Sequence, residues 1–190
     1  MKNYLIGIDI GTQSLRAGIF DFSGQAVAFS SKDYDTYHPQ VGWAEQDAED
    51  WWECAKICTR EALQKAGISP EDIAGISYDS FSCTVLPVDE NGAPLHKALI
   101  WMDIRAVNEA EEITATRHKY LKYSGGWVSP EWMLPKALWF KRNRQDIFNR
   151  AYRFIECTDW FTYKLTGKWT ICMDHIASKW NYVKSEGGFT

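Results

Sequence analysis

The first part of the chain alternates between short apolar runs and polar turns. Residues 4–9 form an Ile-rich run, Gly11–Ser14 is polar, and residues 15–20 resume an apolar pattern. Two apolar runs around a Gly-containing turn predict a β-hairpin. After a second polar turn, residues 25–31 alternate well enough to predict a third strand. The chain is therefore expected to open as a three-stranded antiparallel meander.

After Asp47 the apolar residues are spaced as in a helix rather than as in a strand. Apolar residues recur at helical spacing from Trp51 to Leu63, Asp47 is a suitable N-cap, and Gly67 marks the end. This arrangement predicts the first long helix. Further along, we expect strands at 73–78, 84–88 and 98–101, helices at 107–117, 133–141 and 155–165, a turn at Asn91-Gly92, and an irregular segment at 120–130. Strand pairs that alternate with helices predict an α/β domain with a mixed sheet flanked by helices.

Composition narrows the classes of function. The net charge of −4 gives no basic surface, so nucleic acid is not an expected partner. No apolar stretch is long enough to span a membrane, and the apolar run that Asp9 interrupts is too short for a signal peptide. The five cysteines are odd in number and irregular in spacing, so we expect reduced packing residues rather than disulfides. These features predict a cytoplasmic globular protein.

The most informative segment for chemistry runs from Asp9 to Arg16. A carboxylate at a strand end precedes Gly11, which lets the backbone approach a ligand closely. The side chains of residues 12–14 can donate to phosphate oxygens, and Arg16 adds a fixed positive charge. A carboxylate such as Asp9 would also suit Mg²⁺, which keeps most of its waters. An ordinary hairpin with a polar turn explains the same residues, and on spacing alone both interpretations stay open.

This segment resembles the first phosphate loop of the FGGY carbohydrate kinases. Further motifs of the family follow along the chain in the same order. A chance match of one motif therefore does not explain the resemblance. The family implies an actin-like (ribonuclease H-like) ATPase fold, with a mixed β-sheet flanked by helices. The resemblance rests on four motifs: residues 7–16, residues 42–47 with Trp51-Trp52, residues 100–106, and Asp159-Trp160 with residues 164–167.

Within the family, several segments are similar to the ribulokinases. These are residues 82–89, 131–136 and 154–160, whereas Trp101–Arg105 is similar to the xylulokinases. The resemblance therefore implies ATP-dependent phosphorylation of a sugar hydroxyl, with a ketopentose such as ribulose as the substrate. Xylulose, another ketose or a polyol stays open as the substrate, and so does a catalytically silent sugar- or nucleotide-binding module.

The resemblance also implies roles for individual residues, with ATP and Mg²⁺ as cofactors. Asp9 would hold the metal through water, and Trp101 would form an apolar wall of the sugar pocket. The alternatives are that Trp101 is a core residue, that Asp103 only pairs with Arg105, and that Ser80 and Ser82 face solvent. The implied phosphate-binding residues are Gly11, Thr12, Gln13, Ser14 and Arg16, and the implied sugar-binding residues are Ser80, Phe81, Ser82, Trp101, Asp103 and Glu131.

Kinases of this family are more than twice as long as this chain and hold ATP between two actin-like domains. Their catalytic base is an Asp in a Gly-rich segment that follows the region covered by these residues. We therefore expect residues 1–190 to form an incomplete N-terminal domain, without the base and without the C-terminal ATP-binding domain. The resemblance leaves open a homodimer of the full-length protein.

Overall fold

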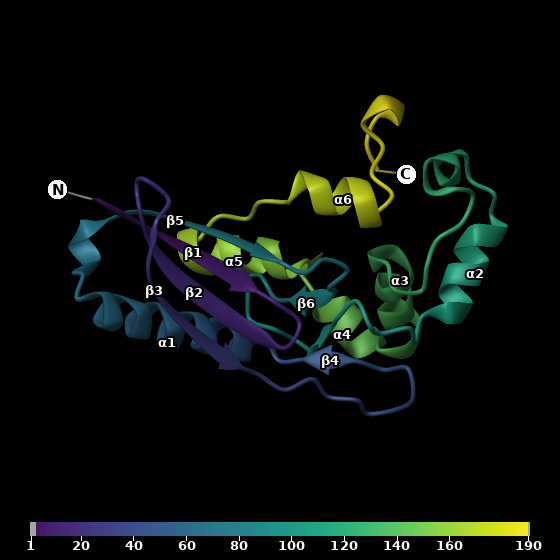
Figure 1. The fold of residues 1–190 in the computed structure, drawn as a ribbon. Coiled ribbons are helices and arrows are strands. Elements are labelled where there is room, and N and C mark those ends of the chain that lie inside the picture. The colour runs from purple at the N-terminus through teal and green to yellow at the C-terminus, as the bar shows by residue number, and fades with distance from the viewer. Residues whose placement is uncertain (1–2, 190) are drawn as a thin grey trace. The chain divides into compact units, whose positions relative to one another are not determined.

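The computed structural model describes residues 3–189 and divides them into two compact units, which are described separately (Figure 1). Up to Thr36, and again from Asp47 to Phe81, the chain forms unit 1. From Tyr37 to Gln46, and from Ser82 onward, it forms unit 2. The α/β class with a mixed sheet, expected from the sequence, is confirmed.

Unit 1 is a four-stranded sheet in the order β3-β2-β1-β5, with one helix on one face. Strands β1, β2 and β3 form the antiparallel meander expected from the hydrophobic pattern, and β5 pairs in parallel with β1. The elements are β1 (Tyr4–Ile10), β2 (Ser14–Asp21), β3 (Ala26–Asp33), α1 (Ala48–Ala66), a 3₁₀ turn (Pro70–Asp72) and β5 (Ile73–Ser80).

The two faces of the sheet differ because side chains alternate along each strand. On one face, the register pairs Ile8 with Ala17 and Ile10 with Leu15, and all four are buried. Helix α1 packs against β2 and β3, and the Cys58 thiol lies 3.7 Å from the Leu15 carbonyl oxygen. The other face carries the polar residues of the hairpin. Burial of the apolar face therefore determines which side the polar residues occupy.

Helix α1 begins and ends where its capping residues require. The Asp47 side chain accepts from the Glu49 N–H at 3.1 Å, and Gly67 closes the helix in a left-handed conformation with φ +65°. The Ile68 N–H then donates to the Leu63 carbonyl at 3.2 Å, which satisfies an otherwise unpaired group of the last turn. Both expected boundaries of this helix are confirmed.

Unit 2 consists of short strands and helices around an aromatic core. Strands β4 and β7 pair with each other, and so do β6 and β8, both antiparallel. Its core includes Met133, Trp139 and Phe140 of α3. The elements are β4 (Glu45–Gln46), β6 (Leu86–Val88), β7 (Ala98–Leu99), α2 (Val107–Ala115), α3 (Met133–Asn143), α4 (Gln145–Arg150), β8 (Arg153–Ile155), α5 (Cys157–Thr166), α6 (Met173–Lys179) and 3₁₀ turns at Lys119–Ser124 and Lys184–Glu186.

Several expected elements of unit 2 need correction. The helix expected at 155–165 begins at Cys157, because Ile155 pairs with Leu86 as part of a strand. The strand expected at 98–101 ends at Leu99, because the Asp103 N–H bonds back to the Ile100 carbonyl and turns the chain. The strand expected at 84–88 begins at Leu86. The segment 120–130, expected to be irregular, begins inside a 3₁₀ turn, and α4 and α6 were not expected at all.

The five cysteines are free, as expected. Among the described residues, no helix is both long enough and apolar enough to cross a membrane.

Candidate active site

The turn between β1 and β2 carries the residues that the sequence assigns to phosphate binding. Asp9 and Arg16 are register partners across the two strands, on the face opposite α1, and their side chains form an ion pair with a 2.6 Å Nη1–Oδ2 distance. Gly11 stands beside them. A Cβ at Gly11 would lie 3.1 Å from the Ser14 carbonyl oxygen and 3.9 Å from both Asp9 Oδ1 and Arg16 Nη1. Glycine therefore keeps the space between the two charged groups open.

Tyr34, just beyond β3, holds this turn from two sides. Its hydroxyl donates to the Gly11 carbonyl, and its backbone N–H donates to the Gln13 carbonyl at 3.2 Å. Within the turn, the Gly11 N–H donates to the Ser14 carbonyl at 3.0 Å. The Ser14 side chain is largely buried and Gln13 is exposed. The turn is thus fixed by its own backbone and by a residue far along the chain.

The strand ends bring a second group of predicted residues next to this turn. Strands β1 and β5 run in parallel, with Ile10 opposite Ser80, and the Phe81 N–H donates to the Ile10 carbonyl at 3.3 Å. The predicted phosphate turn and Ser80-Phe81 therefore leave the same edge of one sheet. In open α/β sheets, ligands bind outside the carboxyl ends of parallel strands. Asp79, which the sequence analysis did not select, lies opposite Asp9 in this register.

The residues at this edge fit a hydrated Mg²⁺ better than an ion coordinated by protein groups alone. Asp9 is half-exposed, with Oδ2 on Arg16 and Oδ1 beside Gly11. Among residues 3–189, no cluster of three or more His, Cys, Asp or Glu side chains could hold an ion. Mg²⁺ commonly uses one or two carboxylates together with substrate phosphates and waters. Asp9 meets that requirement.

In unit 2, the remaining predicted sugar-site residues differ in exposure. Trp101 is 41% exposed, so the alternative that it is a core residue is wrong. Ser82 and Glu131 are half-buried. Glu131 lies shortly before α3, where its backbone N–H donates to the Ser129 hydroxyl at 3.4 Å. Trp101, Ser82 and Glu131 therefore keep part of their surface available for contact.

Asp103 is fully buried and belongs to an ionic network. Its oxygens accept from Arg105 Nε at 2.9 Å and Nη2 at 2.7 Å, and from the Ala44 N–H at 2.7 Å. Arg105 also donates to Glu45 at 2.7 Å, and its guanidinium lies 3.6 Å from the centre of the Trp43 ring. The alternative of an Asp103–Arg105 pair describes this geometry. Contact between Asp103 and a sugar hydroxyl stays a prediction.

Two other buried ionisable side chains, Lys136 and Glu156, bind the backbone around Cys83. The Lys136 ammonium donates to the carbonyls of Cys83 at 2.9 Å and Ile100 at 2.6 Å. Glu156 accepts from the N–H groups of Cys83 at 3.3 Å and Thr84 at 2.9 Å. Burial lowers the pKa of Lys136 to about 8 and raises the pKa of Glu156 to about 8. The sequence analysis quoted the segment around Lys136 but assigned neither residue a role.

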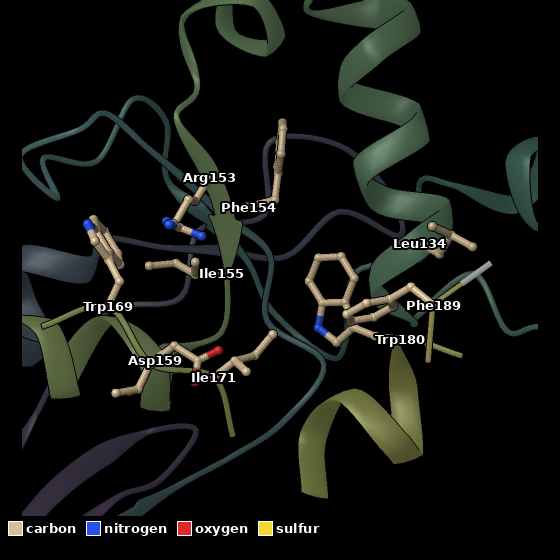
Figure 2. Close-up of a pocket in the computed structure, with 10 residues that line it drawn as sticks. Leu134, Arg153, Phe154, Ile155, Asp159, Trp169, Ile171, Trp180 and Phe189 are labelled. Atoms are coloured by element: carbon tan, nitrogen blue, oxygen red, sulfur yellow. The ribbon is translucent and has the colours of Figure 1, made fainter. Parts of the chain in front are cut away.

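A cavity of about 560 Å³ in unit 2 contains none of the predicted site residues (Figure 2). Figure 2 shows Trp169 and Arg153 on one side and Trp180 and Phe189 on the other, with the Asp159 carboxylate near Ile171. Asp159 accepts from the Cys172 N–H at 2.7 Å. Burial raises the pKa of Asp159 to about 6, against the opposing effect of that N–H. This cavity is separate from the predicted sugar residues.

Tyr34, Lys136 and Glu156 are the residues that sequence reasoning missed. Tyr34 lies in a polar stretch with no motif around it, so no local signal selects it. A lysine inside the apolar period of a helix, as at 136, is the one signal that was available. Its buried partners are distant in sequence and only the structure identifies them.

Comparison with known proteins gives consistent matches over most of the chain. A model of the N-terminal domain of the FGGY family of carbohydrate kinases matches residues 4–184. A human FGGY carbohydrate kinase domain-containing protein is 32% identical over 98% of this chain and 35% of its own length. A ribulokinase of Geobacillus thermodenitrificans is 34% identical over 88% of this chain and 34% of its own length.

Solved structures match in the same way. The crystal structure of xylulose kinase from Rhodospirillum rubrum superposes with a TM-score of 0.84 and 26% sequence identity, over 91% of this chain and 36% of that chain. The chain therefore spans about a third of the length of the curated relatives it matches.

Proposed function

The chain belongs to the FGGY family of carbohydrate kinases, and from this we propose that the whole protein transfers the γ-phosphoryl group of ATP to a hydroxyl of a ketopentose such as ribulose. The observation that carries the proposal is the shared sheet edge, where the Asp9–Arg16 turn lies next to Ser80-Phe81. Phosphoryl transfer depends mainly on placing the two substrates in line and stabilising charge. One edge that presents both sets of residues supports binding of the two substrates next to each other.

On the phosphate side, the turn supplies donors and a cation. We assign the hydroxyls of Thr12 and Ser14, the Gln13 amide and the open space over Gly11 to the β- and γ-phosphates. Arg16 stands next to that space and would exchange part of its bond with Asp9 for phosphate oxygens. The bonds to phosphate oxygens would be charge-assisted like the one to Asp9, so the guanidinium would keep a strong partner after the exchange.

Asp9 is the residue that we assign to Mg²⁺. Its Oδ1 faces the same space as Gly11, where it would accept hydrogen bonds from the waters of a hydrated ion. Bound Mg²⁺ would neutralise part of the charge on the β- and γ-phosphates. Asp9 also orients Arg16, so its loss would affect both groups that compensate phosphate charge.

On the sugar side, we assign Ser80, Phe81, Ser82, Trp101 and Glu131 to the pocket. Aromatic rings exclude water and stack on sugar faces, which suits the exposed indole of Trp101. The half-buried Glu131 carboxylate would accept from sugar hydroxyls. Asp103 is assigned to the same region through Arg105, which it holds with three side-chain hydrogen bonds.

We propose that the remaining machinery lies outside these 190 residues. A hydroxyl nucleophile needs a proton acceptor within hydrogen-bond reach, and ATP needs a site for its base. The matched relatives are about three times as long as the aligned region, which leaves room for both. The five free cysteines suit the cytoplasm, where ATP is supplied and thiols stay reduced.

A substrate panel tests the proposal. The whole protein is incubated with ATP, Mg²⁺ and D-ribulose, L-ribulose, D-xylulose, glycerol or gluconate, and ADP formation is measured. We expect the highest kcat/KM with a ribulose, because residues 82–89, 131–136 and 154–160 resemble the ribulokinases. A preference for xylulose or a polyol would overturn the substrate, and ligand binding without turnover would make the protein a silent binding module.

A further inference from the structure

Two segments of unit 2 that carry predicted sugar-site residues are joined through one buried ammonium group. Ser82 precedes Cys83, and Trp101 follows Ile100. The Nζ atom of Lys136 donates to the carbonyl oxygens of both Cys83 and Ile100, at 2.9 and 2.6 Å. The Lys136 side chain is completely buried. The positions of the two segments are therefore coupled through a residue on α3.

The same segment is held from the other side by a carboxylate. Glu156, directly before α5, accepts the N–H groups of Cys83 and Thr84 and is also completely buried. Cys83 has φ +65°, a left-handed conformation that a residue with a side chain adopts only at a cost. Three of the four hydrogen bonds end on the Cys83 or Thr84 backbone. The pair thus maintains a strained conformation next to Ser82.

We propose that Lys136 and Glu156 are positioning residues of the sugar site, which set the placement of Ser82 and Trp101 relative to each other. The inference rests on the proposed function for its substrate, and on the structure for its geometry. An apolar pair of the same volume would stabilise a core without the desolvation that two buried ionisable groups require. What Lys136 and Glu156 add is four directed bonds to backbone groups of the two segments.

The surroundings of the pair supply the compensating charges. The carboxylates of Asp103 and Glu131 favour the charged form of Lys136. Glu156 has the Asp159 carboxylate and Lys136 as its charged neighbours, and His175 Nδ1 lies 3.9 Å from its Oε1. Charged groups from several segments of unit 2 therefore surround Lys136 and Glu156.

Kinetics of the Lys136→Met variant test the proposal in the whole protein. Methionine keeps an unbranched side chain one atom shorter than lysine and removes the donors, so two buried carbonyls lose their partner. We expect the KM for the ketose to rise about tenfold or more, and the KM for ATP to change less than about twofold. The matched control is Lys141→Met, an exposed lysine on the same helix, which should leave both constants unchanged. An unchanged ketose KM in a folded Lys136→Met variant would overturn the proposal.

The Glu156→Gln variant covers the case in which Lys136→Met does not fold. It keeps the volume and one oxygen, but turns an NH₂ group toward a backbone N–H. We expect a smaller rise of the ketose KM, about threefold to tenfold, with ATP again little affected. Equal losses for ketose and ATP, in proportion to the folded fraction, would show a merely structural role and would overturn the proposal.

Thiol labelling separates this inference from the proposed function. Cys83 is buried and held by the pair, whereas Cys58 lies in the core of unit 1. We expect the labelling rate of Cys83 to rise at least about tenfold in the two variants, while that of Cys58 stays at the wild-type rate. If the wild-type protein phosphorylates no ketose, the proposed function is wrong. The positioning role is then tested by labelling alone, and an unchanged labelling rate of Cys83 in both variants would overturn it.

Discussion

Arg16 donates to Asp9 across the β1–β2 ladder at 2.6 Å, and both side chains remain half-exposed, at 59% and 50%. Exposed ion pairs of this kind contribute little to stability. The two charged groups are therefore positioned at the strand ends but contribute little to the stability of the fold. Such a pair can open toward a polyphosphate with little loss of stability.

Replacing Asp9 by Asn tests the metal role. The change removes the carboxylate charge that would orient the waters of Mg²⁺ and that holds Arg16, so kcat should fall about 10²-fold or more. Stability should change by less than about 0.5 kcal/mol, because the pair is exposed. Steady-state kinetics of the whole protein measure the first effect and urea unfolding the second. Asp35→Asn, at an exposed site beyond β3, is the control. A near wild-type kcat in Asp9→Asn would exclude the metal role.

Replacing Trp101 by Ala tests the sugar pocket. Loss of the ring should raise the ketose KM about tenfold and leave the KM for ATP almost unchanged, since stacking and water exclusion act on the sugar alone. Trp127→Ala is the matched control, because Trp127 is also half-exposed and stacks on Trp132 at 5.8 Å. Similar kinetics for the two variants would place Trp101 away from the sugar.

Replacing Arg105 by Lys tests the buried ionic network. Lysine keeps the positive charge, but its ammonium group cannot reproduce the planar fork of donors that binds Asp103 and Glu45 or lie flat on Trp43, so buried carboxylate oxygens lose hydrogen bonds. The free energy of unfolding should fall by about 2–4 kcal/mol. Arg144→Lys, whose partner Asp146 is exposed, should change it by less than about 0.5 kcal/mol. Chemical denaturation measures the free energy of unfolding of both variants, and equal losses in the two would contradict the network.

The carboxyl group of Asp159 makes stability depend on pH. Its pKa is raised from 3.8 to about 6, so between pH 4 and 6 the native state keeps a proton that the unfolded chain has lost. Its contribution is fully present below pH 4 and is lost as pH rises through 6. Asn cannot titrate, yet its amide oxygen can accept from the Cys172 N–H.

The free energy of unfolding of Asp159→Asn, relative to that of wild type, should therefore rise by about 1–3 kcal/mol between pH 4 and pH 7. Unfolding curves of both proteins across this range give the difference in the free energy of unfolding. The exposed Asp35→Asn serves as the control and should show a constant difference. A pH-independent difference for Asp159→Asn would mean that the buried carboxyl has an ordinary pKa.

The 190-residue chain by itself should show no sugar kinase turnover. It supplies a phosphate turn and residues for one side of a sugar pocket, whereas proton removal and adenine binding are assigned outside it. Purified chain of verified fold is assayed with ATP and ribulose, xylulose or glycerol. Turnover near the kinase range of about 1–100 s⁻¹ would show that the acid–base group lies within these residues.

Where local chemistry is strong, the sequence predicted the fold correctly. The alternation around residues 11–14 predicted the hairpin, and the Asp47 and Gly67 caps predicted the limits of α1. It failed at Ile155, where a strand of three residues pairs with Leu86, and at Ile100, where a turn ends a strand. Partners that are distant along the chain decide such short elements, and no local pattern contains them.

The candidate site divides in the same way. The sequence by itself determined the family and the kinds of residue available at the phosphate turn, because charge, hydrogen-bonding capacity and glycine freedom are properties of single residues. Only the tertiary structure decided that Ser80-Phe81 leaves the sheet beside that turn, that Asp103 is occupied by Arg105, and that Lys136 joins Cys83 to Ile100. Strand register and burial arise from contacts between residues far apart in the chain, and they determine which polar groups have partners and which can meet a ligand.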